Sequence, residues 1–321
     1  MSLLIVIINY RTPQVTIDCL ASLAAQIDDV PGTRVILVDN ASGDNSMPLL
    51  RATIDARGWS SWISLVESDN NRGFAGGNNF GLASVKDLSP APRFVLLLNS
   101  DTIVQPGAIK HCKERMEAEP SIGILSCMLL NSDLTVQNIA RKLPTPLRLA
   151  ASSLGLPWFL PRFFGWANLE DESWDRRTQA RDVDWVGGAF MMIRKDLIDR
   201  MGPMDDRFFF YGEDVEFCHR AWKNGMRVCY DPRATIIHLG GASSDSGRLA
   251  SAQKNALMWQ ARYLIQRRCY GLVAEHFIRT IDIISFGLRH LKLLLRGRKN
   301  SPEYARQRAI LAILLNRGNR S

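Results

Sequence analysis

Three runs of apolar residues in the first third of the chain each end directly in a small group of polar residues. The runs are Leu3–Ile8, Val35–Val38 and Phe94–Leu98. None of them alternates with polar positions, and this pattern is typical of parallel strands that are buried on both faces. The carboxyl ends of such strands meet at one edge of an open α/β sheet, where ligands bind. The pattern therefore predicts one pocket, formed by the polar residues that follow the three strands.

Helical patterns separate the predicted strands. Thr12 followed by Pro13 predicts an N-cap and the first position of a helix that runs to about Gln26. Further helices are expected over about 48–57, just after Asn79 and over about 107–119, with a strand near 63–66. This alternation predicts an α/β fold with a mostly parallel, Rossmann-like sheet flanked by helices.

The second half of the chain is less regular. A proline-spaced, aromatic-rich segment runs from Leu143 to Trp166, and an acidic loop follows it. Beyond that loop we expect a strand over 185–193 that two glycines weaken, a helix over 213–224, and short strands over 227–230 and 234–238. From position 273 onward, apolar residues recur every three or four positions and predict one apolar stripe on a helix: Val273, Phe277, Ile281, Ile284, Leu288, Leu291 and Leu295. The last part is therefore a helical extension.

The positive charge of the chain is concentrated in this extension. The whole chain carries a net charge of +8. From Arg248 onward there are 15 Lys and Arg against 3 Asp and Glu, which gives +12, so the first 247 residues carry −4. A basic amphipathic helix suits an anionic membrane surface. Packing of the stripe on the first part of the chain, or on a second copy in a homodimer, is the alternative.

The spacing of the cysteines and the hydropathy of the chain indicate where in the cell the protein is expected. The six cysteines are scattered without a C-x-x-C pair, so neither a metal cluster nor a disulfide framework is expected. We find no secretory leader and no apolar stretch long enough to span a bilayer. The expected location is the cytoplasm, with peripheral contact at the inner face of the plasma membrane as a further option.

Two carboxylates follow the predicted strands and are candidates for ligand binding. Asp101 comes just after the third strand and could share Mg²⁺ or Mn²⁺ with a diphosphate, because such a cation prefers one or two carboxylates plus substrate oxygens. Asp39, with Ser42 nearby, could accept hydrogen bonds from a nucleobase or ribose, and Asn9 and Tyr10 would complete that pocket. The alternative for either aspartate is a turn in which the carboxylate binds its own backbone. For Asp39, an N-cap of the next helix is a further alternative.

The stretch from Gly73 to Asn79 is rich in glycine. Glycine lets a chain approach a ligand closely, and the helix N-terminus that should follow favours anions. Arg72 adds positive charge to this stretch. The spacing is not the dinucleotide fingerprint G-x-G-x-x-G and it does not follow the first strand, which argues against a nicotinamide oxidoreductase.

Two adjacent acids, Glu213 and Asp214, open the predicted helix after an aromatic run and a glycine. In a partly apolar cleft, desolvation would raise the pKa of such a carboxylate enough for it to act as a general base. The alternative is that the two acids only complement the helix dipole. His238 ends a strand before two glycines and would be a metal ligand only if it faced Asp101.

Taken together, these stretches resemble the inverting family-2 glycosyltransferases with the GT-A fold, in particular the rhamnosyltransferase-like branch. The resemblance covers about the first 240 residues and is carried by six stretches in the expected order: Ile8–Tyr10, Val38–Ser42, Asn71–Asn79, Leu98–Asp101, Trp185–Gly188 and Gly212–Asp214. It implies a GT-A fold, a nucleotide-sugar donor and a divalent cation, Mg²⁺ or Mn²⁺.

The resemblance also implies roles for individual residues. Asp214 would be the catalytic base with Glu213 in support, and Asp101 would bind the cation, with His238 as a further ligand. The donor would be held by Asn9, Tyr10, Asp39, Ser42, Arg72, Gly73, Asn78 and Ser100, and the acceptor side would be lined by Trp185, Gly187 and Gly188. The expected division is a nucleotide-sugar-binding half over 1–130, an acceptor and catalytic-base half over 131–245, and the basic tail over 246–321.

The expected reaction transfers a sugar with inversion from a nucleotide diphosphate sugar, with dTDP-L-rhamnose as the family-weighted donor, to a glycan or lipid-linked acceptor in cell-surface polysaccharide assembly. A sugar nucleotidyltransferase would also use a metal and an aspartate at a strand end. A non-catalytic basic protein that binds membrane or nucleic acid is the third class. Nucleic acid is not expected as a partner, because the positive charge lies on one amphipathic tail.

Overall fold

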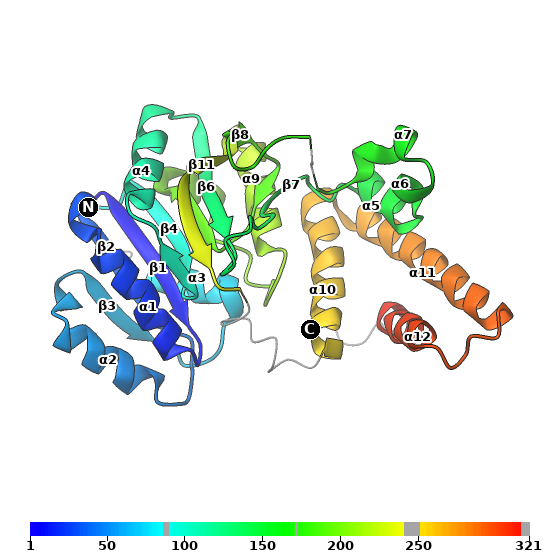
Figure 1. The fold of residues 1–321 in the computed structure, drawn as a ribbon, viewed down its shortest axis with the longest axis horizontal. Helices are drawn as coiled ribbons and strands as arrows, with labels where there is room; N and C mark the ends of the chain where they lie inside the picture. Colours follow the sequence, from blue (N-terminus) through cyan, green and yellow to red (C-terminus); the bar gives the residue numbers. More distant parts are fainter. Residues whose placement is uncertain (86–89, 171–172, 241–250, 316–321) are drawn as a thin grey trace. The chain divides into compact units, whose positions relative to one another are not determined.

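The computed structural model describes residues 1–85, 90–170, 173–240 and 251–315. The chain forms two compact units (Figure 1). The first, here called the sheet unit, comprises Met1–Arg141 and Glu172–Ser246, and the second, the helical unit, comprises Lys142–Asp171 and Gly247–Ser321. The segment 142–171 thus groups with the tail and not with the residues on either side of it. The functional division expected from the sequence stays a prediction, because compactness does not test function.

The sheet unit is built on one nine-stranded sheet. Four parallel strands form its first half in the order β3-β2-β1-β4: β1 (Leu3–Asn9), β2 (Thr33–Asp39), β3 (Ile63–Glu67) and β4 (Phe94–Asn99). The second half continues β10-β6-β11-β5: β5 (Thr102–Val104), β6 (Ile122–Leu130), β10 (Phe190–Arg194) and β11 (Arg227–His238), while β8 (Arg181–Asp182) pairs with β11. There, only β6 and β11 run parallel. A separate pair joins β7 (Ala140–Arg141) to β9 (Trp185–Val186).

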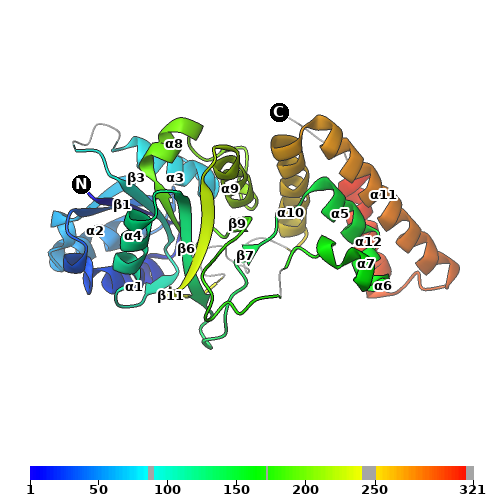
Figure 2. The same cartoon turned by 90° about the horizontal axis from the view of Figure 1, so that it is seen from above.

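Helices cover both faces of the sheet, as Figure 2 shows. On one face of the sheet, alternate residues of its strands, including β1 and β2, form one core with α1 (Pro13–Ala24), α2 (Ser46–Ala56) and α4 (Ala108–Ala118). The intervening residues pack on the other face against α3 (Gly73–Ala83), α8 (Lys195–Met201) and α9 (Glu213–Lys223). Burial on both faces explains why these strands are apolar without interruption. The predicted α/β class with flanking helices is confirmed.

Some local predictions differ from the structure. Thr12 precedes α1 but its side chain makes no capping hydrogen bond, because its backbone does not adopt the usual cap conformation. The expected strand over 185–193 is split into β9 and β10 at Gly187 and Gly188, and the two short strands expected over 227–238 are one strand with a bulge after Asp231. β6 was not predicted, although it lies in the middle of the second half of the sheet.

The glycine-rich stretch is a helix and not a loop. α3 begins at Gly73 itself, and its glycines allow close packing: a Cβ on Gly77 would lie 2.9 Å from Ile8 Cδ1, and one on Gly81 would lie 2.8 Å from Val6 Cγ1. A Cβ on Gly73, which has a φ of +66°, would lie 2.1 Å from the carbonyl oxygen of Phe209. These glycines therefore seat α3 on the sheet and on the loop before α9.

The helical unit contains α5 (Pro146–Ser153), α6 (Leu156–Phe159), α7 (Pro161–Phe164), α10 (Ser251–Ile265), α11 (Leu272–Leu295) and α12 (Pro302–Leu315). Its small core includes Leu149, Tyr263, Ile278 and Leu314. A buried carboxylate, Asp282, is held inside this unit by Arg262 Nε at 2.9 Å and Tyr263 Oη at 3.0 Å. A charge buried in this way needs such partners. Within the described part of the chain, no helix is both long and apolar enough to cross a bilayer.

Candidate functional site

The polar residues predicted to share a pocket lie at one edge of the sheet. β1, β2 and β4 are neighbours and run parallel, and Asn9 is in register with Asp39. Because β2 lies on one side of β1 and β4 on the other, the strand order reverses at β1, which is where open α/β sheets bind ligands. Asn9, Asp39, Asn99 and Asp101 all lie at or just beyond the carboxyl ends of these strands.

Asp39 is buried and organises the turn that follows β2. Its Oδ1 accepts hydrogen bonds from Asn9 Nδ2 at 2.7 Å and from Ser42 Oγ at 2.6 Å, and its Oδ2 accepts one from the Ser42 amide at 3.0 Å. Thr16 Oγ1 donates to Asn9 Oδ1 and fixes the orientation of that amide. Asp39 thus makes the hydrogen bonds to its own turn that the sequence analysis gave as the alternative to ligand binding. A carboxylate has about four acceptor sites, so one remains for a ligand.

Arg11 belongs to this edge and was missed by the sequence analysis. Its amide donates to Ser42 Oγ at 2.9 Å, its Nε donates to Ser42 O at 2.7 Å, and its guanidinium lies 5.1 Å from the ring centre of Tyr10. Arg11 has a φ of +58°, as does Ala41 in the turn after β2. Such conformations are costly for residues other than glycine and often occur at functional sites. No pattern in the sequence marked Arg11.

Arg72 and Asn78 are engaged within the fold. The Nε of Arg72 donates to Ser68 Oγ at 2.8 Å, and its guanidinium lies 5.1 Å from the ring centre of Phe80. Asn78 is buried and its Nδ2 donates to Phe74 O one turn earlier in α3. Their predicted contacts with the donor remain predictions.

Asp101 faces His238, as a shared metal site would require. Asp101 is 1% exposed, and its Oδ1 lies 3.3 Å from His238 Nε2. The pairing of β11 with β5 sets this arrangement, because His238 is in register with Thr102 and the Leu239 amide donates to Asp101 O. Ser100 between the strands is also buried, and within the described residues its Oγ has no hydrogen-bond partner.

Carboxylate oxygen and imidazole nitrogen are ligands that suit Mn²⁺ and, for the oxygen, Mg²⁺. The residues at this point therefore fit a divalent cation that is completed by substrate oxygens. Among the described residues, no cluster of three or more His, Cys, Asp or Glu could hold a metal alone. A cation here would thus take its remaining ligands from substrate oxygens and water.

Glu213 is buried and Asp214 is half-buried in the first turn of α9. Burial raises the pKa of Asp214 to about 6, although backbone amides of Val215 and Gly188 donate to its carboxylate and oppose that rise. Burial, and then the charge of Asp214, raise the pKa of Glu213 to about 8. Glu213 Oε2 has no hydrogen-bond partner within the described part of the chain. Asp214 accepts hydrogen bonds from two neighbouring backbone amides, and these stabilise its charged form, so Asp214 loses its proton at a lower pH than Glu213. Near pH 7, therefore, Asp214 is ionised and Glu213 keeps its proton.

Backbone contacts connect this pair to the metal candidate. The Gly188 amide bonds to Asp214, and the next residue, Ala189, accepts the Asn99 amide at 3.0 Å. Asn99 lies two residues before Asp101. The acidic pair and Asp101 are thus both tied to the end of β4, through adjacent residues of one segment.

The residues predicted for the acceptor side surround this segment. Trp185 lies on β9 opposite Arg141, whose guanidinium is 6.0 Å from the indole centre, and the Gly187 amide donates to Ile139 O. A Cβ on Gly188 would lie 2.9 Å from the Phe74 ring, so any larger residue there would require that ring to move. Burial raises the pKa of Asp214, and the positive charge of Arg141 partly opposes that rise. The sequence analysis did not identify Arg141 as a site residue.

The central sheet with its flanking helices and C-terminal helices is that of the GT-A fold. The chain belongs to the glycosyltransferase-like family 2, since the model of that family matches residues 2–261. Solved structures agree on the fold. The mannosyltransferase PcManGT of Pyrobaculum calidifontis, in complex with GDP-Man and Mn²⁺, aligns with a TM-score of 0.54 at 16% identity over 97% of this chain and 84% of its own. S. aureus TarS in complex with UDP-GlcNAc aligns with a TM-score of 0.54 at 15% identity over 98% and 80%.

Relatives that carry a functional name are similar at 26–28% identity. The low-salt glycan biosynthesis hexosyltransferase Agl10 of Haloferax volcanii is 26% identical over 90% of this chain and 84% of its own length. The N-acetylglucosaminyl-diphospho-decaprenol L-rhamnosyltransferase of Mycobacterium tuberculosis is 28% identical over 45% of this chain and 46% of its own length. The rhamnosyltransferase WbbL of Escherichia coli is 26% identical over 61% and 71%. The predicted membership of the family-2 glycosyltransferases is confirmed.

Proposed function

We propose that this glycosyltransferase moves a sugar from a nucleotide diphosphate sugar to an acceptor hydroxyl in one inverting displacement, with Asp214 as the base. The observation that carries the proposal is the pair of Glu213 and Asp214 at the start of α9, in which hydrogen bonds from backbone amides keep Asp214 ionised. A carboxylate with a pKa of about 6 is mostly ionised at neutral pH yet basic enough to accept a proton as an acceptor oxygen attacks.

The other residues would bind and orient the donor. Asn9, Asp39 and Ser42, together with Arg11 and Tyr10, would hold the nucleoside at the ends of β1 and β2. Asp101 and His238 would hold a divalent cation, and when bound this cation neutralises the charge that grows on the leaving diphosphate. Glu213, neutral near pH 7, would donate a hydrogen bond without adding a second negative charge beside Asp214. Trp185 and Gly188 would shape the acceptor side.

The names of the relatives support a more specific proposal. Two of them are rhamnosyltransferases, and one of these names a lipid-linked sugar diphosphate as its acceptor. We therefore propose dTDP-L-rhamnose as the first donor to test and a lipid-linked or glycan hydroxyl as the acceptor. Assembly of cell-surface polysaccharide at the inner face of the plasma membrane is the corresponding setting.

The donor is tested by incubating the purified chain with Mn²⁺ or Mg²⁺ and a panel of nucleotide sugars, and measuring release of the nucleotide diphosphate. We expect one nucleotide sugar to be consumed, with activity lost on chelation and in the Asp101→Asn variant. The configuration of the product, read by NMR, tests inversion. Retention of the donor's anomeric configuration would remove Asp214 from the role of base.

A sugar nucleotidyltransferase is the second candidate, because it would use the same cation site. It is distinguished by its products. Pyrophosphate formation from a nucleoside triphosphate and a sugar 1-phosphate, without consumption of any nucleotide sugar, would favour it over the transferase.

We further propose that the helical unit provides a surface that docks on the membrane of a lipid-linked acceptor. α11 has two acidic residues, Glu275 and Asp282, on its buried side, whereas large apolar side chains along one stripe of the helix are exposed. The exposed residues on this stripe, which we call the outer stripe, are Val273, Phe277, Ile284, Leu288, Leu291 and Leu295. Ile281, predicted to belong to it, packs instead against the core of the unit. Exposed apolar surface of this extent typically marks an interaction site.

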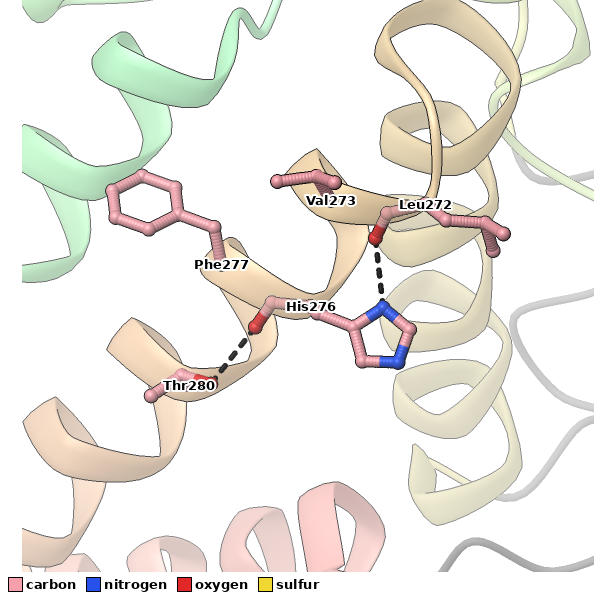
Figure 3. A pocket seen from close by; sticks show the side chains of 5 residues that line it. All are labelled: Leu272, Val273, His276, Phe277 and Thr280. Carbon is pink, nitrogen blue, oxygen red and sulfur yellow. Dashed lines mark hydrogen bonds between the residues drawn. The ribbon is translucent and has the colours of Figure 1, made fainter.

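The first turns of α11 show how the outer stripe stays apolar. A hollow of about 460 Å³ is lined there by Leu272, Val273, His276, Phe277 and Thr280 (Figure 3). His276 Nδ1 donates to Leu272 O, and Thr280 Oγ1 donates to His276 O, so the two polar side chains bond to their own helix (Figure 3). The hollow lies on the unit without proposed catalytic residues, so we assign it to binding of the partner and not to the reaction.

Charge favours an anionic membrane as the occupant of the outer stripe. From Ile283 to Pro302 the sequence has no acidic residue, and it carries Arg289, Lys292, Arg296, Arg298 and Lys299. In the same unit, Trp158 is 91% exposed, Phe159 80% and Phe163 73%. Exposed aromatic and aliphatic side chains beside cations are the pattern of interfacial membrane helices.

Flotation with vesicles tests this surface. We expect binding to vesicles of phosphatidylglycerol and phosphatidylcholine, weaker binding to phosphatidylcholine alone, and a loss of about tenfold or more when Leu288 and Leu291 are both replaced by glutamine. Leu134→Gln, an exposed leucine of the sheet unit, is the matched control and should bind normally. If the double variant instead abolishes a dimer and binding to vesicles never occurs, the stripe is a homodimer interface and the membrane proposal is wrong.

A further inference from the structure

A chain of hydrogen bonds leads from Asp133 to His238 through three polar side chains of the sheet unit. Thr135 Oγ1 donates to Asp133 Oδ1 at 2.6 Å, and Asn131 Nδ2 lies 2.8 Å from Thr135 Oγ1. Gln137 Nε2 lies 2.7 Å from Asn131 Oδ1, and Gln137 Oε1 lies 2.8 Å from His238 Nδ1. We call this chain the relay. The loop that carries it returns onto β6, where Leu130 pairs with Val136.

The direction of every bond in the relay follows from its first member. Hydrogen bonds from Thr135 lower the pKa of Asp133, so its carboxylate stays ionised and can only accept. Thr135 must then donate to Asp133, which leaves its oxygen as the acceptor for Asn131 Nδ2. The oxygen of Asn131 consequently faces Gln137 and accepts from its Nε2.

A second bond fixes the amide of Gln137. Gln137 Nε2 also lies 2.8 Å from the carbonyl oxygen of His238. Turning this amide over would place its oxygen against two other acceptor oxygens, those of Asn131 and His238. The amide oxygen of Gln137 is therefore held against His238 Nδ1, and that ring nitrogen must carry a proton.

The other ring nitrogen is left to face the proposed cation site. His238 Nε2 lies 3.3 Å from Asp101 Oδ1 and 3.3 Å from Asn99 Nδ2, which can donate to it. In a neutral ring whose proton is on Nδ1, Nε2 presents a lone pair beside the carboxylate of Asp101. Two electron-pair donors at this separation repel each other unless a positive charge lies between them. Outer hydrogen bonds of this kind orient histidine ligands in metal sites.

We propose that Gln137 is a positioning residue, which holds His238 in the Nδ1–H form so that Nε2 is directed at a divalent cation shared with Asp101. Gln137 touches neither substrate nor cation in this scheme and acts only through the imidazole. The proposal rests on the cation site of the proposed function. Its test is therefore chosen so that the two can fail separately.

The first test needs neither metal nor activity. Long-range ¹H–¹⁵N NMR of the metal-free protein at about pH 8.5, where an ordinary histidine is neutral, reports which ring nitrogen carries the proton. The His238 signals are assigned by their loss in His238→Ala. We expect a protonated Nδ1 and an unprotonated Nε2 in the wild type. A neutral ring with its proton on Nε2 overturns the proposal, and this measurement requires no variant of Gln137 to fold.

The second test measures Mn²⁺ affinity by electron paramagnetic resonance with a nucleoside diphosphate present. We expect Gln137→Leu to weaken binding by roughly tenfold to a hundredfold. Gln179→Leu, which alters an exposed glutamine of the same unit outside the relay, should bind normally. In Asn131→Leu, which frees the amide of Gln137 to turn, we expect a smaller loss.

The pattern across variants separates the two proposals. If Asp101→Asn and His238→Ala weaken Mn²⁺ binding but Gln137→Leu does not, the positioning role of Gln137 is refuted and the cation site stands. If Asp101→Asn leaves Mn²⁺ affinity unchanged, the cation site itself is wrong, whatever Gln137 does. Only a loss in all three variants together with the Nδ1–H ring supports the proposal.

Discussion

Replacing Asp214 by asparagine removes the proposed base while keeping its size and its ability to accept the amide hydrogen bonds of Val215 and Gly188. Donor binding should therefore persist. Loss of a general base costs about a hundredfold to ten-thousandfold in turnover. We expect Asp214→Asn to retain the affinity of the wild type for the nucleoside diphosphate with Mn²⁺, within about threefold, and to lose at least about a hundredfold in kcat.

The pH dependence of the wild type follows from the same residue. With a pKa of about 6 for Asp214, the ionised fraction falls from about nine tenths at pH 7 to about one tenth at pH 5. Activity should fall by about tenfold over that range and approach one decade per pH unit below it. Because substrate binding alters the surroundings of Asp214, the value for the free enzyme is read from kcat/KM.

The assay is release of nucleotide diphosphate from the donor identified in the panel, measured under single-turnover conditions so that product release does not limit the rate. Glu213→Gln is the matched control, because glutamine resembles the protonated form that Glu213 adopts near pH 7. Its kcat should fall less than about tenfold, and its acid limb should stay near pH 6. An Asp214→Asn variant with near-normal turnover, or a Glu213→Gln variant that loses as much, would refute this assignment.

The other predictions concern stability. The folded pKa of Glu213 is raised from 4.5 to about 8, so the folded state binds an extra proton between these values and stability falls as pH rises through them. Glu213→Gln should therefore melt at a higher temperature than the wild type at pH 8 and at nearly the same temperature at pH 4.5, and a constant difference would contradict the shift. Gly77→Ala should cost about 1–3 kcal/mol in urea unfolding through its clash with Ile8, whereas Gly287→Ala, with open space around it in α11, should add up to about 1 kcal/mol. Arg262→Met leaves the carboxylate of Asp282 uncompensated and should cost on the order of 3 kcal/mol; an unchanged unfolding midpoint would show that this pair contributes nothing.

The parallel half of the sheet was predictable because burial on both faces leaves a direct mark on the sequence. β1, β2 and β4 are continuous apolar runs, and each begins and ends within about two residues of its predicted limits. The positions of Asp39, Asp101 and Asp214 at or near the ends of elements followed from the same pattern. Their roles remain proposals, but the structure does bring Asp101 and the acidic pair to the end of β4.

The features that were missed depend on contacts between distant residues. The glycines of α3 suggest a loop when only local preference is considered, yet they permit a helix to lie against Ile8 and Val6. β6 has apolar residues without alternation and no turn motif that separates it from a helix. Gln137 gains its significance only because His238, 101 positions away, lies beside it. No local pattern contains that information.

The apolar stripe of α11 shows a different limit. Its period was visible in the sequence, and a stripe usually faces the core of the protein. Here the core of the helical unit is satisfied by the opposite side of the helix, where Asp282 pairs with Arg262 and Tyr263. Period alone reveals that a face is apolar, but it does not reveal which partner covers it.

Anomalous diffraction at the manganese edge, from crystals grown with Mn²⁺ and a nucleotide diphosphate, examines the proposed chemistry most directly. We expect one strong peak about 2.0–2.3 Å from Asp101 and His238 Nε2, bridged to the diphosphate on the side that faces Asp214. A manganese ion bound elsewhere, with neither Asp101 nor His238 among its ligands, would contradict the proposed mechanism.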